Sequence, residues 1–290
     1  MTHSSTPARA RAFAGRMPIR DTHLWVERIG DGPLIIALHG GLGFDHTGLT
    51  PWLDPLADQA TLVYVDQRGQ GRSERLPPEV WETVTHATLV EDIDALRAAH
   101  GAERVILIGH SYGGFLSLDY ALAHPDRLAG LVLVSAAPSF AHGAVIAGNA
   151  IARDPVVGTR FIAALGALPA DDAAYAADLP GFLSLYFHRG DGDGFMARTS
   201  YSAAAAARSL GALVGAWSVA DRLAEIQVPT LVIGGDDDFI SPLELCSKQL
   251  ADGIPGATLA VMPECGHFAF VEQHERFLAA VRPFLAGLAR

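Results

Sequence analysis

The sequence predicts an α/β fold with a mostly parallel central sheet, flanking helices and a helical cap inserted late in the sheet. Apolar runs end repeatedly in polar, glycine-rich loops, and helix-like segments lie between these runs. The runs are continuously apolar rather than alternating, which is typical of parallel strands covered on both faces. The cap is expected over residues 138–221, where no strand pattern occurs.

The predicted elements follow one another along the chain. An edge strand is expected late in the first twenty residues, and later strands, each taken with its loop, are expected in 22–30, 31–41, 60–73, 103–111, 128–137, 229–242 and 257–267. Helices are predicted over 85–101, 112–125 and 272–290. The first of these helices has Leu89, Ile93 and Leu96 on one face, and Gly101 marks its end.

The cap divides the predicted core into two parts, residues 1–137 and 222–290. Residues 138–221 are rich in alanine and contain helix-like pieces such as 158–169 and 201–217. This segment is much longer than the connections that usually join two strands. We therefore expect it to form a helical cap rather than a simple crossover.

The composition disfavours nucleic acid and membranes as partners of this protein. Half of the 290 residues are hydrophobic, and no apolar run reaches the roughly 20 residues that span a bilayer. The net charge of −11 disfavours nucleic acid and anionic lipid as partners. The N-terminal stretch has no apolar signal core, so a cytoplasmic protein is expected. A homo-oligomer stays open.

The two cysteines, Cys246 and Cys265, are expected to be buried free thiols. Two isolated cysteines form neither a zinc-binding spacing nor a disulfide framework. No metal site is predicted.

The stretch 105–121 places one serine between glycines where a predicted strand runs into a helix. Gly109, Ser111 and Gly113 spell G-x-S-x-G, the pattern of a nucleophile elbow. In an elbow the serine hydroxyl points out above the sheet, and the helix N-terminus faces the site. Ser111 is therefore the candidate nucleophile.

An elbow requires an acid after a later strand and then a histidine, in that chain order. The loop after the strand in 229–242 contains three aspartates in a row, residues 236–238. His267 alone among twelve histidines lies in the loop after the last strand. Histidine suits the base because its ordinary pKa lies near neutral pH.

The negative charge that develops on the substrate oxygen needs two backbone donors. One is expected from Tyr112, the residue after the nucleophile, and the other from the loop His-Gly-Gly-Leu-Gly that follows an early strand. In that loop Gly41 is the first choice, because it has no side chain, and Leu42 is the alternative. His39 is expected to form hydrogen bonds beneath the loop.

Together these motifs resemble the α/β-hydrolase superfamily. The matching stretches are 39–41, 66–73, 109–114, 235–238 and 266–267, in the family's order and across nearly the whole chain. The resemblance implies an α/β-hydrolase fold and a catalytic triad of Ser111, Asp238 and His267. It assigns the acid to Asp238, because in the family the acid follows the strand-end glycine and precedes a turn to proline. A serine triad requires no cofactor.

The stretch 66–73 and the double glycine after His39 most resemble proline iminopeptidases. Those enzymes usually have proline where this chain has Leu42, and they hold the substrate's amino group with glutamates from the cap. This chain has no glutamate between Glu103 and Glu225. Five aspartates of the cap could substitute: Asp171, Asp172, Asp178, Asp191 and Asp193.

The sequence therefore favours a serine hydrolase that cleaves carboxylic esters or lactones of small, mainly apolar substrates. An iminopeptidase-like aminopeptidase is the alternative, and a carbon–carbon bond hydrolase or a non-catalytic ligand receptor also stays open. Leu42, Phe44, Phe140 and Trp217 are predicted to line the substrate pocket, together with the ring of Tyr112.

Overall fold

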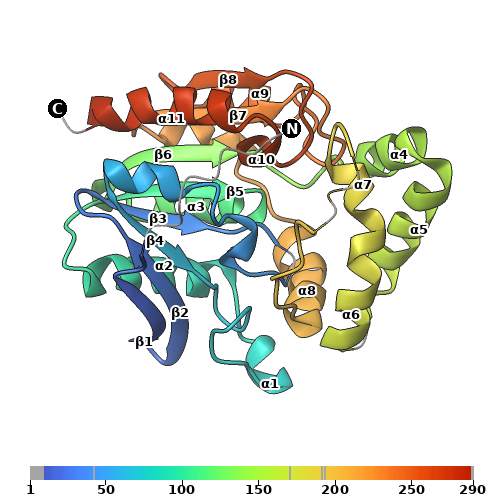
Figure 1. Cartoon of the computed structure of the whole chain (residues 1–290), viewed down its shortest axis with the longest axis horizontal. Helices are drawn as coiled ribbons and strands as arrows, with labels where there is room; N and C mark the ends of the chain where they lie inside the picture. Colours follow the sequence, from blue (N-terminus) through green and yellow to red (C-terminus); the bar gives the residue numbers. More distant parts are fainter. Residues whose placement is uncertain (1–9, 42, 170, 191, 193, 289–290) are drawn as a thin grey trace.

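The computed structural model describes residues 10–41, 43–169, 171–190, 192 and 194–288. Its centre is an eight-stranded sheet in the order β1-β2-β4-β3-β5-β6-β7-β8 (Figure 1). Strand β2 pairs antiparallel with β1 and β4, and every other pairing is parallel. The prediction of a mostly parallel sheet is therefore confirmed. The strands are β1 (Phe13–Ile19), β2 (Thr22–Ile29), β3 (Leu34–Leu38), β4 (Thr61–Val65), β5 (Val105–His110), β6 (Leu128–Val134), β7 (Thr230–Gly235) and β8 (Thr258–Met262).

Two hydrophobic cores lie on the two faces of the sheet. In β3 the side chains of Ile36 and Leu38 belong to one core, and those of Ile35 and Ala37 belong to the other. Because both faces are covered, the central strands need apolar residues at every position, as the continuous runs predicted. Edge strand β1 instead alternates between more and less exposed residues along its length.

Helices α2 (His86–Ala99) and α3 (Tyr112–Ala123) pack against one face, and α11 (His274–Leu288) packs against the other (Figure 1). The predicted C-terminal helix is divided, because Gln273 leaves helical geometry between the two pieces. The further core helices are α1 (Pro78–Trp81), α9 (Ser247–Gly253) and α10 (Ala269–Glu272), with short helices η1 (His46–Gly48), η2 (Asp54–Asp58), η3 (Pro125–Arg127) and η6 (Ala220–Glu225).

The described residues between β6 and β7 form helices and no strand. Their ends meet at one isolated bridge between Ser139 and Ser218. Figure 1 shows α4, α5 and α6 grouped at one end of the sheet. The division of the chain at residues 138 and 221 stays a prediction. The helices are α4 (Gly143–Arg153), α5 (Pro155–Gly166), α6 (Asp172–Asp178), η4 (Leu179–Phe182), α7 (Leu183–Tyr186), α8 (Ala203–Arg208) and the π-helix η5 (Ser209–Val214).

Gly113, in the first turn of α3, packs directly on the end of β3. A Cβ atom there would lie 2.3 Å from the carbonyl oxygen of Leu38 and 2.7 Å from that of His39. Backbone atoms cannot easily move aside, so Gly113→Ala should lower the free energy of unfolding by about 1–3 kcal/mol in urea titrations. The matched control is Gly287→Ala in α11, where a Cβ would meet nothing within 4 Å. That change should be neutral or stabilising by about 0.5–1 kcal/mol, and equal losses in both variants would contradict the close packing.

Candidate active site

Ser111 occupies a sharp turn between β5 and α3. Its backbone has φ 52° and ψ −118°, a positive φ that costs a non-glycine residue about 1–3 kcal/mol. The turn is held by a hydrogen bond of 2.9 Å from the N–H of Ser111 to the carbonyl of Val134. At Gly109 a Cβ would lie 2.5 Å from the carbonyl oxygen of Gly113, so the elbow closes only around glycine.

His267 and Asp238 lie together at the ends of neighbouring strands β8 and β7. Nδ1 of His267 lies 2.7 Å from Oδ2 of Asp238, and both side chains are buried. Burial raises the pKa of Asp238, but the interactions with His267 and with the N–H groups of Ile240 and Ser241 outweigh it and leave the pKa below its ordinary value. An ionised Asp238 accepts only, so Nδ1 of His267 carries a proton and donates it to Oδ2.

The other two aspartates of this loop have different partners. Asp236 accepts a hydrogen bond of 3.3 Å from the N–H of Cys265. Asp237 forms an ion pair with Arg153, and its Oδ2 also lies 2.7 Å from Nδ1 of His188. The structure therefore brings only Asp238 of the three to His267.

The hydrogen bonds of His39 orient the peptide that joins Gly40 to Gly41. Nε2 of His39 accepts from the N–H of Gln67 at 3.2 Å, so Nδ1 carries the proton and donates to the carbonyl of Gly40 at 2.6 Å. Burial lowers the pKa of His39, which keeps the ring neutral. Because C=O and N–H point in opposite directions across a trans peptide, the N–H of Gly41 points away from His39. Gly41 and Ser111 line the same cavity.

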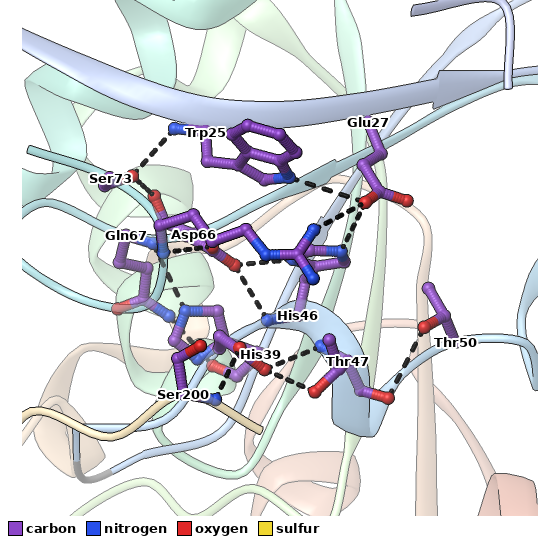
Figure 2. A network of polar contacts seen from close by, with 12 residues as sticks. Trp25, Glu27, His39, His46, Thr47, Thr50, Asp66, Gln67, Ser73 and Ser200 are labelled. Atoms are coloured by element: carbon purple, nitrogen blue, oxygen red, sulfur yellow. Dashed lines mark hydrogen bonds and ion pairs between the residues drawn. The ribbon is translucent and has the colours of Figure 1, made fainter. Parts of the chain in front are cut away.

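A buried ionic network connects His46, which follows the loop that carries Gly41, with Asp66 and Glu27 (Figure 2). The carboxylate of Asp66 accepts from Nδ1 of His46 at 2.6 Å, and Nε2 of His46 lies 3.2 Å from Glu27. Burial opposes protonation of His46, but the hydrogen bonds to these carboxylates outweigh it and raise its pKa to about 9. The hydrogen bond with His46 is also the main reason why the pKa of Glu27 falls to about 2.

Asp45 connects the loop after β3 with the segment that precedes α8. One carboxylate oxygen accepts from the N–H of Thr47 at 2.9 Å, and the other accepts from the N–H of Ser200 at 2.8 Å. A hydrogen bond of 2.8 Å from the N–H of Ser202 to the carbonyl of Gly43 adds a second link. The loop carrying Gly41 is therefore held by both the sheet and the segment that precedes α8.

Two cavities meet at Ser111. The larger one encloses about 980 Å³, part of it open to solvent, and its wall is mainly apolar and aromatic. The smaller one encloses about 490 Å³, also partly open, and is lined by His267 as well as Ser111. The rings that line the larger cavity are Phe44, Tyr112, Phe115, Phe140, His142, Phe161, Tyr175, Phe182 and Tyr186.

The predicted pocket residues differ in their positions. Phe44, Phe140 and Tyr112 line the larger cavity, whereas Leu42 lies outside the described residues. The ring of Trp217 stacks on Phe115 at a centroid distance of 4.3 Å, and its Nε1 donates to Asp119. Phe115 lines the larger cavity and Trp217 does not line it directly, so a binding role for Trp217 stays a prediction.

Several lining residues were missed because the cap carries no motif. Phe161, Phe182 and Tyr186 stand in helical segments where an aromatic residue is equally typical of a plain core.

The predicted buried free thiols are found, and burial raises the pKa of both Cys246 and Cys265.

Residues 33–273 match the family model described as alpha/beta hydrolase fold. The chain belongs to the α/β-hydrolase family. A curated relative is "Putative carbamate hydrolase RutD" of Caulobacter sp. (strain K31), 32% identical over 88% of this chain and 91% of the relative. Another is the proline iminopeptidase PfmaB of Pestalotiopsis fici, 29% identical over 88% of this chain and 92% of the relative. The crystal structure of VinJ superposes with a TM-score of 0.81 at 25% identity, over 96% of this chain and 100% of VinJ.

The described part of this α/β-hydrolase contains no helix that is both long and apolar enough to cross a bilayer. Over the same residues, no three metal-ligating side chains gather to bind an ion.

Proposed function

We propose that this α/β-hydrolase cleaves carboxylic esters or lactones of small, mainly apolar molecules through an acyl-enzyme on Ser111. The observation that carries the proposal is the buried 2.7 Å contact between His267 and Asp238, in a site where Ser111 occupies a strained elbow. This pairing holds the imidazole through Nδ1 and leaves Nε2 as the nitrogen that can act as a general base.

The reaction begins when Ser111 attacks the substrate carbonyl carbon. Nε2 of His267 takes the hydroxyl proton as Oγ bonds to the carbon, and Asp238 stabilises the imidazolium that results. The backbone N–H groups of Gly41 and Tyr112 are the proposed donors to the oxyanion, each contributing about 10²–10³ in rate. His267 then gives its proton to the leaving oxygen as the carbon–oxygen bond breaks, and water repeats the sequence to release the acid.

The two cavities suit the two halves of the substrate. The leaving group must lie beside the nitrogen that protonates it, so we assign it to the smaller cavity, which His267 lines. The acyl group then occupies the larger cavity, whose wall has His142 and Asp178 among many apolar side chains. A bulky or aromatic acyl group on a small leaving group is the preferred substrate of this arrangement.

Asp178 favours the alternative function, an aminopeptidase. It contributes a carboxylate to the wall of the larger cavity, where the amino group of an N-terminal residue would lie. Arg160 is its neighbour, with Nη2 4.0 Å from Oδ1 of Asp178, and both side chains are about half exposed. An exposed carboxylate with a cationic neighbour holds an ammonium group weakly, so the esterase function has the stronger support.

A substrate panel separates these functions. On p-nitrophenyl esters from acetate to octanoate and phenylacetate, kcat/KM should rise about fourfold for each buried methylene until the larger cavity is full, from ~0.8 kcal/mol per CH₂. Lactones should be turned over in the same series, and proline p-nitroanilide should be poor. Fast turnover of the anilide with slow turnover of every ester would overturn the proposal. If Asp178→Asn then loses the anilide activity but keeps the ester activity, the aminopeptidase is established.

A further inference from the structure

We propose that the cap segment Leu185–His188 acts as a strap that sets the relative positions of the acid loop and the base loop, and that Arg153 and Glu272 are positioning residues that hold it. The strap is defined by these four residues, at the end of α7. The inference rests on the proposed function, since it concerns the geometry between Asp238 and His267.

On the acid side, Arg153 joins the strap to the loop that carries Asp238. Its guanidinium donates to the carbonyls of Leu185 at 2.8 Å, Phe187 at 3.1 Å and Asp237 at 2.7 Å. It also forms an ion pair of 2.5 Å with the Asp237 side chain, which is 42% exposed and so adds little stability by itself. The hydrogen bonds to the three carbonyls are therefore the main connection. Because one of these carbonyls belongs to Asp237, Arg153 is bound to the residue next to Asp238.

On the base side, the carboxylate of Glu272 bridges the strap and the loop that carries His267. One oxygen accepts from the N–H of Gly266 at 2.7 Å, and the other accepts from the N–H of His188 at 2.7 Å. The strap also binds the base directly, because the N–H of His267 donates to the carbonyl of Tyr186 at 2.7 Å. A Cβ at Gly266 would lie 2.3 Å from that carbonyl oxygen, so the two backbones are in contact.

The acid and base loops also contact one another. The N–H of Asp237 donates to the carbonyl of Cys265 at 3.0 Å. A Cβ at Gly235 would lie 2.3 Å from the carbonyl oxygens of both Cys265 and Gly266. The strap therefore lies against two loops that are already packed together, and a shift of the strap has to change the contact between Asp238 and His267.

Tyr186 connects the strap to the substrate space. Its ring lines both cavities, and its centroid lies 5.6 Å from that of His267. The ring of Tyr186 thus faces the substrate space, while its carbonyl accepts the hydrogen bond from the backbone N–H of His267. The strap makes the cap a part of the catalytic geometry as well as a wall of the pocket.

The test is Glu272→Gln, with Glu275→Gln on the exposed face of α11 as the matched control. The substituted amide keeps one carbonyl oxygen and places its N–H₂ against the second backbone N–H, so the bridge is broken with little change in volume. The rate at which a fluorophosphonate modifies Ser111 should fall about tenfold or more, because small displacements of catalytic groups reduce rates strongly. For the best ester, kcat should fall by the same factor while KM changes less than twofold. The control should leave both rates unchanged.

A second readout separates positioning from a general loss of stability. The far-downfield proton resonance of the hydrogen bond between His267 and Asp238 should shift or broaden in Glu272→Gln while the unfolding temperature remains well above that of the assay. If Glu272→Gln does not fold, the pair Arg153→Lys and Arg153→Met replaces it, and the lysine variant should retain the larger part of kcat.

The outcomes distinguish the two proposals. A wild-type protein that does not react with the fluorophosphonate overturns the proposed serine hydrolase. A reactive wild type, with Glu272→Gln or Arg153→Met reacting at the same rate and showing the same downfield resonance, overturns the strap alone.

Discussion

Ser111→Ala is expected to lower kcat/KM for the best ester by about 10⁴–10⁶-fold, because it removes the atom that forms the proposed acyl-enzyme. The two proposed backbone donors and the cavities remain, so substrate binding should change little. The measurement is a steady-state assay with each variant purified in a column that has never held the wild-type enzyme. Activity within tenfold of wild type would contradict the assignment of Ser111.

Ser111→Gly is the matched control for the elbow. Like alanine it removes the hydroxyl, but glycine adopts the positive φ of 52° without strain. Both variants should be inactive, while the glycine variant should be more stable than the alanine variant by about 1–3 kcal/mol in urea titrations. Equal stabilities would show that the elbow stores no strain at this position.

His46→Ala should lower the free energy of unfolding by about 3–5 kcal/mol, because it leaves the buried carboxylate of Asp66 without its cation. The side chain of Asp66 is fully buried, so water cannot replace the lost partner well, whereas Glu27 keeps its ion pairs with Arg11 and Arg72. Urea titration at pH 6 measures the loss. His23→Ala removes a solvent-exposed histidine–glutamate pair and should leave the free energy of unfolding nearly unchanged.

The same network makes stability depend on pH in a defined window. The pKa of His46 is raised from 6.5 to about 9, so its stabilisation is complete below pH 6.5 and is lost as pH rises through 9. The pKa of Glu27 is lowered from 4.5 to about 2, so its stabilisation is complete above pH 4.5 and is lost as pH falls toward 2. The alkaline decline should be absent from His46→Ala, and its persistence there would assign the decline to other groups.

Much of the fold was predictable because the parallel strands are buried on both faces. β3 and β5 are buried at every position, and such strands need apolar runs that are visible without any partner. The elbow was equally visible, since Gly109 and Gly113 are required by contacts within a few residues of the chain or with the adjacent strand end. Local geometry of this kind restricts which residue types can occupy neighbouring positions, so it can be recognised in the sequence.

Side-chain orientation was not predictable to the same degree. Trp217 and Phe115 are both aromatic and stack on one another, but it is Phe115 that lines the larger cavity, and this difference depends on packing between distant segments. The strap shows the same limit, because Glu272 acts through the backbone N–H groups of residues 266 and 188. Backbone N–H groups have the same chemistry at almost every residue, so no pattern of letters marks which of them a carboxylate will bind.

The sequence by itself determined the mostly parallel α/β sheet, the family motifs and the chain order of Ser111, Asp238 and His267. These features depend on short stretches whose hydrophobicity, glycine content or spacing is constrained locally. Only the tertiary structure decided which aromatic rings line the two cavities and that the strap lies across both loops. Those contacts join segments far apart in the chain, and their formation depends on the packing of the cap against the sheet.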